Sequence, residues 1–134
     1  VLVPPNRQSE ILIWSWISRY SGLLLIHNSL FDLKVMYHRI SRLPKRFDDT
    51  ALMLKTLINN SDVWKAKIGL KEVMGEYYAP SWALYDEYEP EDSRNPKFLM
   101  YAATDGAATF KLWVDIQMHV MGDAWSHPEE RDFK

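Results

Sequence analysis

The segment Leu23-Leu24-Leu25-Ile26-His27-Asn28-Ser29-Leu30-Phe31-Asp32 begins with an unbroken apolar run and turns polar directly after it. Such a run is typical of a short strand that is buried on both faces of a parallel sheet. We therefore expect residues 23–27 to be an interior strand. Because α/β folds bind ligands at the carboxyl ends of their strands, we expect Asp32 to lie at the edge of a cleft. A simpler interpretation is that Asn28 or Ser29 caps the next helix and that Asp32 favours its dipole.

Residues with helical spacing flank this strand on both sides. Two helices are predicted, over residues 6–20 and residues 30–41. The second helix is expected to turn four side chains inward: Leu33, Met36, Tyr37 and Ile40. Residues 46–49 then predict a second short strand, and Asp48 or Asp49 is a candidate cap for the helix that follows. Because a helix connects the two strands, the order predicts a parallel pair in an α/β fold.

The rest of the chain is predicted to be mainly helical. We expect a short helix over residues 69–78 and the longest helix over residues 97–121. Between them, residues 79–96 combine prolines with acidic side chains, which is typical of an exposed loop, here with one helical turn. Residues 122–134 are polar, so we expect one domain over residues 1–121 and a tail or linker after it.

The composition excludes several kinds of protein. The 134 residues include no cysteine, so a metal would be held by carboxylates, which favours Mg²⁺ or Mn²⁺. No run approaches the ~20 apolar residues of a membrane-spanning helix, so we expect a soluble protein without a membrane partner. The net charge of −2 argues against binding nucleic acid by bulk charge, but not against an enzyme that holds a few nucleotides in a cleft.

Tyr101 and Asp105 are four residues apart in the longest predicted helix, so their side chains project from the same face. Taken alone, this spacing is common and is typical of a pair that faces solvent. Gly106 follows directly, in the middle of the helix, where glycine costs roughly 1 kcal/mol relative to alanine. We therefore expect another element to approach the helix closely at Gly106.

Four blocks of sequence, in this order, resemble the DEDD-type 3′→5′ exonuclease domains of bacterial and phage family A DNA polymerases. Residues 27–32 (HNSLFD) resemble the second motif of that family, Asn-x-x-(Phe/Tyr)-Asp. Residues 101–109 (YAATDGAAT) resemble its third motif in the tyrosine form, Tyr-x-x-x-Asp. Residues 47–53 (FDDTALM) and 69–73 (GLKEV) resemble two segments between these motifs. The resemblance extends from residue 23 to about residue 116.

The resemblance implies an RNase H-like α/β fold, a mixed sheet with a parallel centre flanked by helices. It also implies a proofreading enzyme that removes nucleotides from the 3′ end of single-stranded DNA with two Mg²⁺ or Mn²⁺ ions. Asp32 and Asp105 would be catalytic metal ligands, and Tyr101 would be a catalytic residue that orients the attacking water. Asn28 and Phe31 would bind the 3′-terminal nucleotide, although Phe31 is equally consistent with a core residue.

The first motif of the family, Asp-x-Glu, supplies two of the four metal-binding carboxylates and is absent from the sequence. We therefore expect a chain that lacks the first strands of the sheet and is weak or inactive as a nuclease by itself. It would depend on the rest of a polymerase chain, or form a homodimer or bind a partner chain through the open sheet edge. The family implies an intracellular, cytoplasmic location in a bacterial or phage-infected cell.

Two alternative functions stay open at this point. One is an RNase D-like exonuclease that trims RNA, because contacts to a 2′-hydroxyl are not readable from the sequence. The other is a degenerate exonuclease fold that is not catalytic and serves as an interaction module.

Overall fold

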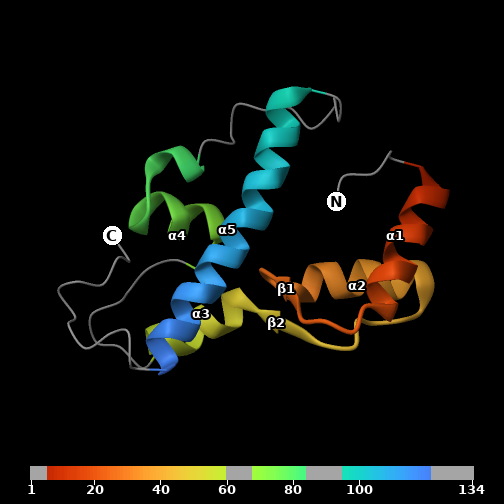
Figure 1. The fold of residues 1–134 in the computed structure, drawn as a ribbon, viewed down its shortest axis with the longest axis horizontal. Helices are drawn as coiled ribbons and strands as arrows, with labels where there is room; N and C mark the ends of the chain where they lie inside the picture. The colour runs from red at the N-terminus through yellow and green to blue at the C-terminus, as the bar shows by residue number, and fades with distance from the viewer. Residues whose placement is uncertain (1–5, 60–67, 84–94, 122–134) are drawn as a thin grey trace. The chain divides into compact units, whose positions relative to one another are not determined.

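A computed structural model describes three stretches of the chain, residues 6–59, 68–83 and 95–121. The chain divides into two compact units, Val1–Asp49 and Thr50–Lys134 (Figure 1). Three features predicted from the sequence lie wholly or largely outside the described residues: the strand end at residues 1–3, the acidic part of the loop over residues 79–96, and the tail over residues 122–134.

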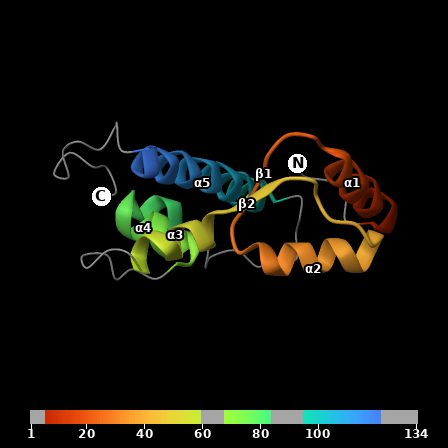
Figure 2. The same cartoon turned by 90° about the horizontal axis from the view of Figure 1, so that it is seen from below.

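The first unit contains a parallel β-α-β arrangement (Figure 2). Strand β1 (Leu24–Ile26) pairs with strand β2 (Phe47–Asp49), with Leu25 opposite Asp48, and helix α2 (Ser29–Ile40) connects the two strands. The predicted parallel pair with its helical connection is therefore confirmed. In its described part the chain is mixed α/β, mostly helical, with a small two-stranded parallel sheet.

Strand β1 differs from the interior strand that its apolar run predicts. Within residues 6–59, 68–83 and 95–121 its sheet has two strands, so β1 has a neighbour on one side only. Each of its three residues is half-buried. An interior strand needs a neighbouring strand on each side, and an apolar run does not show whether both neighbours are present.

Helix α1 (Arg7–Arg19) packs against α2 within the first unit. The Asn6 side chain caps α1 by accepting a hydrogen bond from the backbone N–H of Ser9 at 2.9 Å. Arg39 Nε on α2 forms an ion pair with Glu10 Oε1 on α1 at 3.0 Å. The helix predicted before the apolar strand is therefore confirmed.

Met36 is the buried residue at the centre of the inward face of α2, with 1% of its surface exposed. Tyr37, which was expected to face inward, is 59% exposed. Successive residues of a helix are about 100° apart around its axis, so a face centred on Met36 leaves the next side chain at its flank. The inward assignment of Tyr37 is wrong for this reason.

The second unit is helical where it is described. Helix α3 (Thr50–Asn59), helix α4 (Leu70–Tyr77) and the 3₁₀ helix η1 (Pro80–Ala83) precede the 26-residue helix α5 (Pro96–Met121). Helices α3 and α4 both pack against α5 (Figure 1). The helices and the single turn predicted for this half of the chain are confirmed. Among the helices described, none combines the length and the apolar character needed to cross a membrane.

A hydrophobic cluster holds the helices of the second unit together. It consists of Leu54 on α3, Val73 on α4, and Leu112 and Ile116 on α5, all with at most 1% of their surface exposed. Ala108, one turn before Leu112, continues the same buried stripe. Fully burying a large apolar side chain contributes roughly 1.5–3 kcal/mol, so this stripe decides which face of α5 is turned inward.

Candidate functional site

The residues that resemble the second motif lie where β1 ends and α2 begins, as the sequence predicts. Asn28 adopts a left-handed backbone conformation there (φ 63°, ψ 59°) and makes no capping hydrogen bond with its side chain. Asparagine tolerates this conformation better than most residues, because its short polar side chain bonds locally. The tight turn at Asn28 brings Asp32 into the first turn of α2.

Asp49, on the neighbouring strand, fixes this turn. Its buried carboxylate accepts hydrogen bonds from the backbone N–H of Asn28 at 3.0 Å and of Ser29 at 2.7 Å. The first N–H groups of a helix have no partner within the helix, and the helix dipole favours a negative charge beside them. The sequence suggested Asp48 or Asp49 as a cap for the helix after them. The two Asp49 contacts described here serve the start of α2, because parallel pairing brings the ends of the two strands together.

Asp32 therefore has a negatively charged neighbour. Burial raises the pKa of the Asp32 carboxyl group, a backbone hydrogen bond opposes this rise, and the charge of Asp49 adds to it. Two carboxylates that repel each other favour either a proton or a cation nearby. The charge of Asp49 thus disfavours the ionised form of Asp32, in addition to the larger effect of burial.

Phe31 is 69% exposed, and Asn28 beside it on the turn is exposed as well. Of the two interpretations of Phe31, a core residue is wrong for the described part of the chain. An exposed aromatic ring next to an exposed amide has the chemistry needed to stack on a base and to hydrogen-bond to it.

Tyr101 and Asp105, which resemble the third motif, lie one turn apart on α5 and share a contact with Lys71 of α4. The Lys71 ammonium lies 4.2 Å from the centre of the Tyr101 ring and forms an ion pair with the Asp105 carboxylate. The Lys71 side chain is only 13% exposed, and that of Asp105 is 36% exposed. The pair is therefore not a purely solvent-facing one, and Tyr101, Asp105 and Lys71 together form a partly buried cluster.

A second cluster of the same three residue types joins α5 to Tyr78, the C-cap residue of α4. Lys111 Nζ lies 4.7 Å from the centre of the Tyr78 ring and 3.4 Å from Asp115 Oδ2. Here the tyrosine hydroxyl itself donates a short hydrogen bond to Asp115 Oδ2. Burial, together with this hydrogen bond, raises the pKa of Tyr78, so its hydroxyl stays protonated at ordinary pH. This second cluster resembles no exonuclease motif and provides a reference for the first.

Within the described residues, no other element approaches α5 closely at Gly106. A Cβ atom at Gly106 would meet no atom of the described chain within 4 Å outside its own stretch of helix. The residue is exposed, and the buried stripe of α5 lies on another face. For the part of the chain that the structure describes, the expectation drawn from the cost of a glycine in a helix is therefore wrong.

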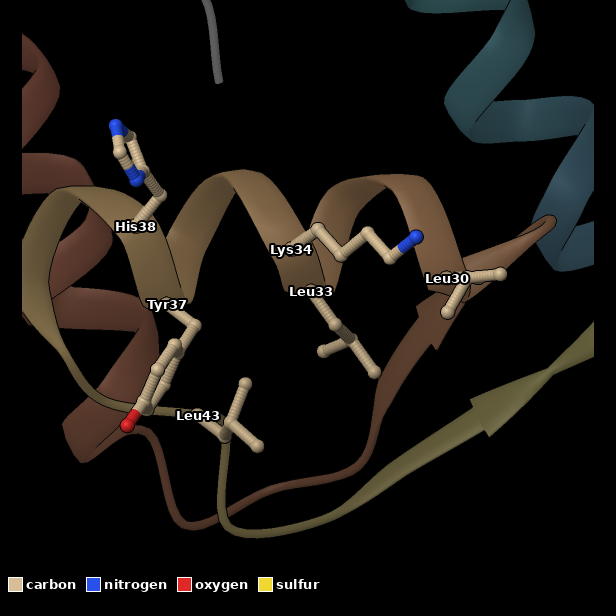
Figure 3. A pocket seen from close by; sticks show the side chains of 6 residues that line it. All are labelled: Leu30, Leu33, Lys34, Tyr37, His38 and Leu43. Atoms are coloured by element: carbon tan, nitrogen blue, oxygen red, sulfur yellow. The ribbon is translucent and has the colours of Figure 1, made fainter.

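An open groove of about 510 Å³ lies on α2 (Figure 3). It is lined by Leu30, Leu33, Lys34, Tyr37, His38 and Leu43. In the figure, Leu33, Tyr37 and Leu43 lie on the same side of the helix. Leu30, a variable position of the second motif, lines this groove, but none of the candidate catalytic or substrate-binding residues does, so the groove is not part of the candidate site.

The described residues do not form a divalent-cation site by themselves. Nowhere in the described stretches do three histidine or acidic side chains gather closely enough to hold a metal ion. Asp105 already has the Lys71 ammonium as its partner. Asp32 and Asp105 belong to different compact units, so their meeting in one metal cluster stays a prediction.

Sequence reasoning missed two residues of the candidate site, Asp49 and Lys71. Both lie inside blocks that resemble the exonuclease family, residues 47–53 and residues 69–73, but the resemblance implies no site role for either residue. For Lys71, the sequence signal was a charged residue next to apolar residues at helical spacing. A charged residue beside an apolar run that packs inward, such as Lys71 next to the buried Val73 and Met74, is held close to the neighbouring helix.

A scan against protein-family models found no match to this chain, and searches of curated proteins and of solved structures found none either. A functional assignment therefore depends on the residues and their geometry.

Proposed function

We propose that this chain is part of a DEDD-type 3′→5′ exonuclease domain with an RNase H-like fold, of the proofreading kind found with family A DNA polymerases. Its activity would be the hydrolytic removal of nucleotides from the 3′ end of single-stranded DNA. One observation carries the proposal: Tyr101 and Asp105 share one partly buried cluster, and its third member, Lys71, comes from another block that resembles the same family.

The arrangement around the second motif supports the same proposal. Asp32 follows a parallel strand at its carboxyl end, where α/β enzymes place their ligands. The negative charge of Asp49 makes its surroundings favourable for a cation. Asn28 and Phe31 are exposed on the same turn, as residues that contact a terminal nucleotide need to be.

In the proposed reaction, water attacks the phosphorus of the last phosphodiester bond, and the 3′ oxygen of the preceding nucleotide leaves. Two Mg²⁺ or Mn²⁺ ions would supply an activated water and stabilise the leaving oxygen. Asp32 and Asp105 would give carboxylate oxygens to such ions, but an Asp-x-Glu pair from outside this sequence is also required. The rest of a polymerase chain, or a second chain, would supply that pair.

The remaining residues of the motifs would handle water and substrate. The Tyr101 hydroxyl would orient the attacking water, a role that contributes ~10² to 10⁴ in rate when an acid–base or orienting group is well placed. The Phe31 ring would stack on the terminal base, and the Asn28 amide would hydrogen-bond to the same nucleotide.

One observation favours a second candidate, a non-catalytic interaction module. The charge of Asp105 is already balanced by Lys71, so the second unit needs no metal ion to satisfy this carboxylate. A degenerate exonuclease fold of this kind would keep the motif residues for stability and not for chemistry.

A degradation assay on 3′-labelled single strands distinguishes these functions. The 134-residue chain and a longer polypeptide that includes an Asp-x-Glu segment are each incubated with a DNA strand, or with an RNA strand of the same sequence, in Mg²⁺ or Mn²⁺. We expect background degradation by the chain alone and shortening of the DNA from its 3′ end by the longer polypeptide. Degradation of RNA alone would identify an RNA-trimming enzyme, and an inactive longer polypeptide would identify the interaction module.

A further inference from the structure

We propose that the groove on α2 is a docking site for an acidic, amphipathic helix of a protein partner. The groove lies within the first compact unit and contains none of the candidate catalytic or substrate-binding residues. The inference therefore goes beyond the proposed nuclease function and does not depend on it.

Apolar side chains make up most of the lining of the groove. Leu30, Leu33 and Tyr37 follow one another at intervals of three and four residues, so they lie along one side of α2. The helix ends at Ser41, which has a left-handed backbone (φ 53°), and the chain then places Leu43 on the same side as Tyr37 (Figure 3). Leu30 is 64% exposed and Leu43 is 49% exposed. Large apolar side chains gathered in one exposed patch mark an interaction surface.

The spacing of these side chains suits a helix as the partner. From Leu30 to Tyr37, α2 makes about two turns over roughly 10 Å. A partner helix with apolar residues at i, i+3 or i+4 and i+7 matches this stripe, because helices pack through side-chain ridges of the same period. A nucleic acid strand fits the lining less well. Tyr37 is the one aromatic ring among the described lining residues, and leucine offers no flat ring to a base and no donor to a phosphate.

Positive charge borders the groove and sets the sign of the charge that the partner carries. Lys34 and His38 line the groove, and residues 30–46 contain five Lys or Arg against one acidic residue, Asp32. The rest of the chain has the opposite balance, 11 Lys or Arg against 17 Asp or Glu. In the stretches that the structure describes, no acidic side chain forms an ion pair with Lys34. Acidic residues that flank the apolar stripe of a partner helix therefore meet complementary charge here.

The test is the fluorescence anisotropy of labelled peptides titrated with the 134-residue chain. One peptide of about 18 residues, long enough to form a helix, has leucine at i, i+3, i+4 and i+7 and glutamate elsewhere. A second peptide has lysine in place of every glutamate, and a labelled single DNA strand is the third probe. The glutamate peptide should bind at least about tenfold more tightly than the lysine peptide, and added salt should reduce this preference.

Matched substitutions locate the binding surface. Leu30→Ala should weaken binding of the glutamate peptide by about fivefold, whereas Leu12→Ala, at a leucine of α1 that is 70% exposed, should change it by less than about twofold. Lys34→Glu should also weaken binding by about fivefold, and Lys55→Glu, at an exposed lysine of α3, should not. If amide spectra show that Leu30→Ala does not fold, Leu43→Ala replaces it in the same titration.

The inference is overturned if the glutamate peptide does not bind, or if both peptides bind equally. Equal effects of the substitutions inside and outside the groove would overturn it as well. Binding of the DNA strand alone, weakened by Lys34→Glu, would identify a nucleic-acid surface instead of a docking site for a helix. Because peptide binding needs no nuclease activity, this inference and the proposed function fail separately.

Discussion

Asp32 and Asp105 resemble residues of two motifs of one family, yet the structure gives them charged neighbours of opposite sign. Asp32 has the carboxylate of Asp49 as a neighbour, and its pKa is raised by burial and by that charge. Asp105 has the ammonium of Lys71 as its partner. A motif therefore specifies a residue type, whereas elements elsewhere in the chain, here β2 and α4, set how strongly that residue attracts a cation.

These local charges also oppose the net charge of the unit in which each aspartate lies. Residues 1–49 contain seven Lys or Arg against four Asp or Glu, a net charge of +3, and residues 50–134 contain nine against fourteen, a net charge of −5. The acidic neighbour of Asp32 thus lies in the basic unit, and the basic neighbour of Asp105 lies in the acidic one. A nearby charge outweighs distant ones, because exposed charges are screened within about 10 Å at ordinary salt concentrations.

The largest expected effect is a difference in nuclease activity between substitutions of Asp105 and of Asp115, the aspartates of the two clusters. In the longer polypeptide with an Asp-x-Glu segment, Asp105→Asn should reduce strand degradation to background, because a neutral amide cannot balance cationic charge at the reacting phosphate. The loss should exceed the ~10² to 10³-fold typical of removing one stabilising group. The isosteric change Asp115→Asn should leave the rate within about twofold, since no motif involves it. Equal losses in both variants would erase the functional difference between the clusters.

The next effect tests whether Asp49 organises the start of α2. Asp49→Ala removes the acceptor of two backbone N–H groups and should lower the free energy of unfolding by roughly 2–3 kcal/mol, measured by urea denaturation. Asp49→Asn keeps one acceptor oxygen and should lose less. It should also lower the pKa of Asp32, followed by NMR titration, because it removes the neighbouring negative charge. An unchanged Asp32 pKa in this variant would contradict the pairing of the two carboxylates.

A smaller change, an increase in stability, is expected from a substitution next to Asp105. Gly106→Ala should raise the free energy of unfolding by roughly 0.5–1 kcal/mol, because the helix interior gains a better helix former and the new Cβ meets no other element among the described residues. Ala107→Gly, at an exposed position of the same helix, should cost a similar amount. Thermal unfolding of both variants provides the measurement. Destabilisation by Gly106→Ala would mean that another element does approach α5 there.

The smallest effect concerns the pH dependence of Asp32. Its pKa in the folded chain lies above the ordinary value of 3.8, so folding disfavours the ionised form. The charge of Asp32 therefore lowers stability at neutral pH, and this cost disappears as the pH falls through the raised pKa and below 3.8. Asp32→Asn should be slightly more stable than the wild type at pH 7 and equal to it below that range. A gain that persists in acid would point to a cause other than charge.

The sequence by itself determined those features that depend on neighbours along the chain. The spacing of apolar residues predicted the positions of α1, α2, α4 and α5 to within a few residues. The strand–helix–strand order gave a parallel pair, because a helical connection returns the chain in the same direction. The spacing of Tyr101 and Asp105 placed them on one face of α5, since residues four apart differ by little more than one helical turn.

Only the tertiary structure decided which charges meet. The Asp49 carboxylate reaches amides 20 and 21 residues earlier in the chain, and Lys71 reaches Asp105 from a different helix. The exposure of Tyr37 and the open space beside Gly106 likewise depend on where neighbouring elements lie. Periodicity identifies the face of a helix but not what packs against it, and the charge beside a carboxylate is set by that packing.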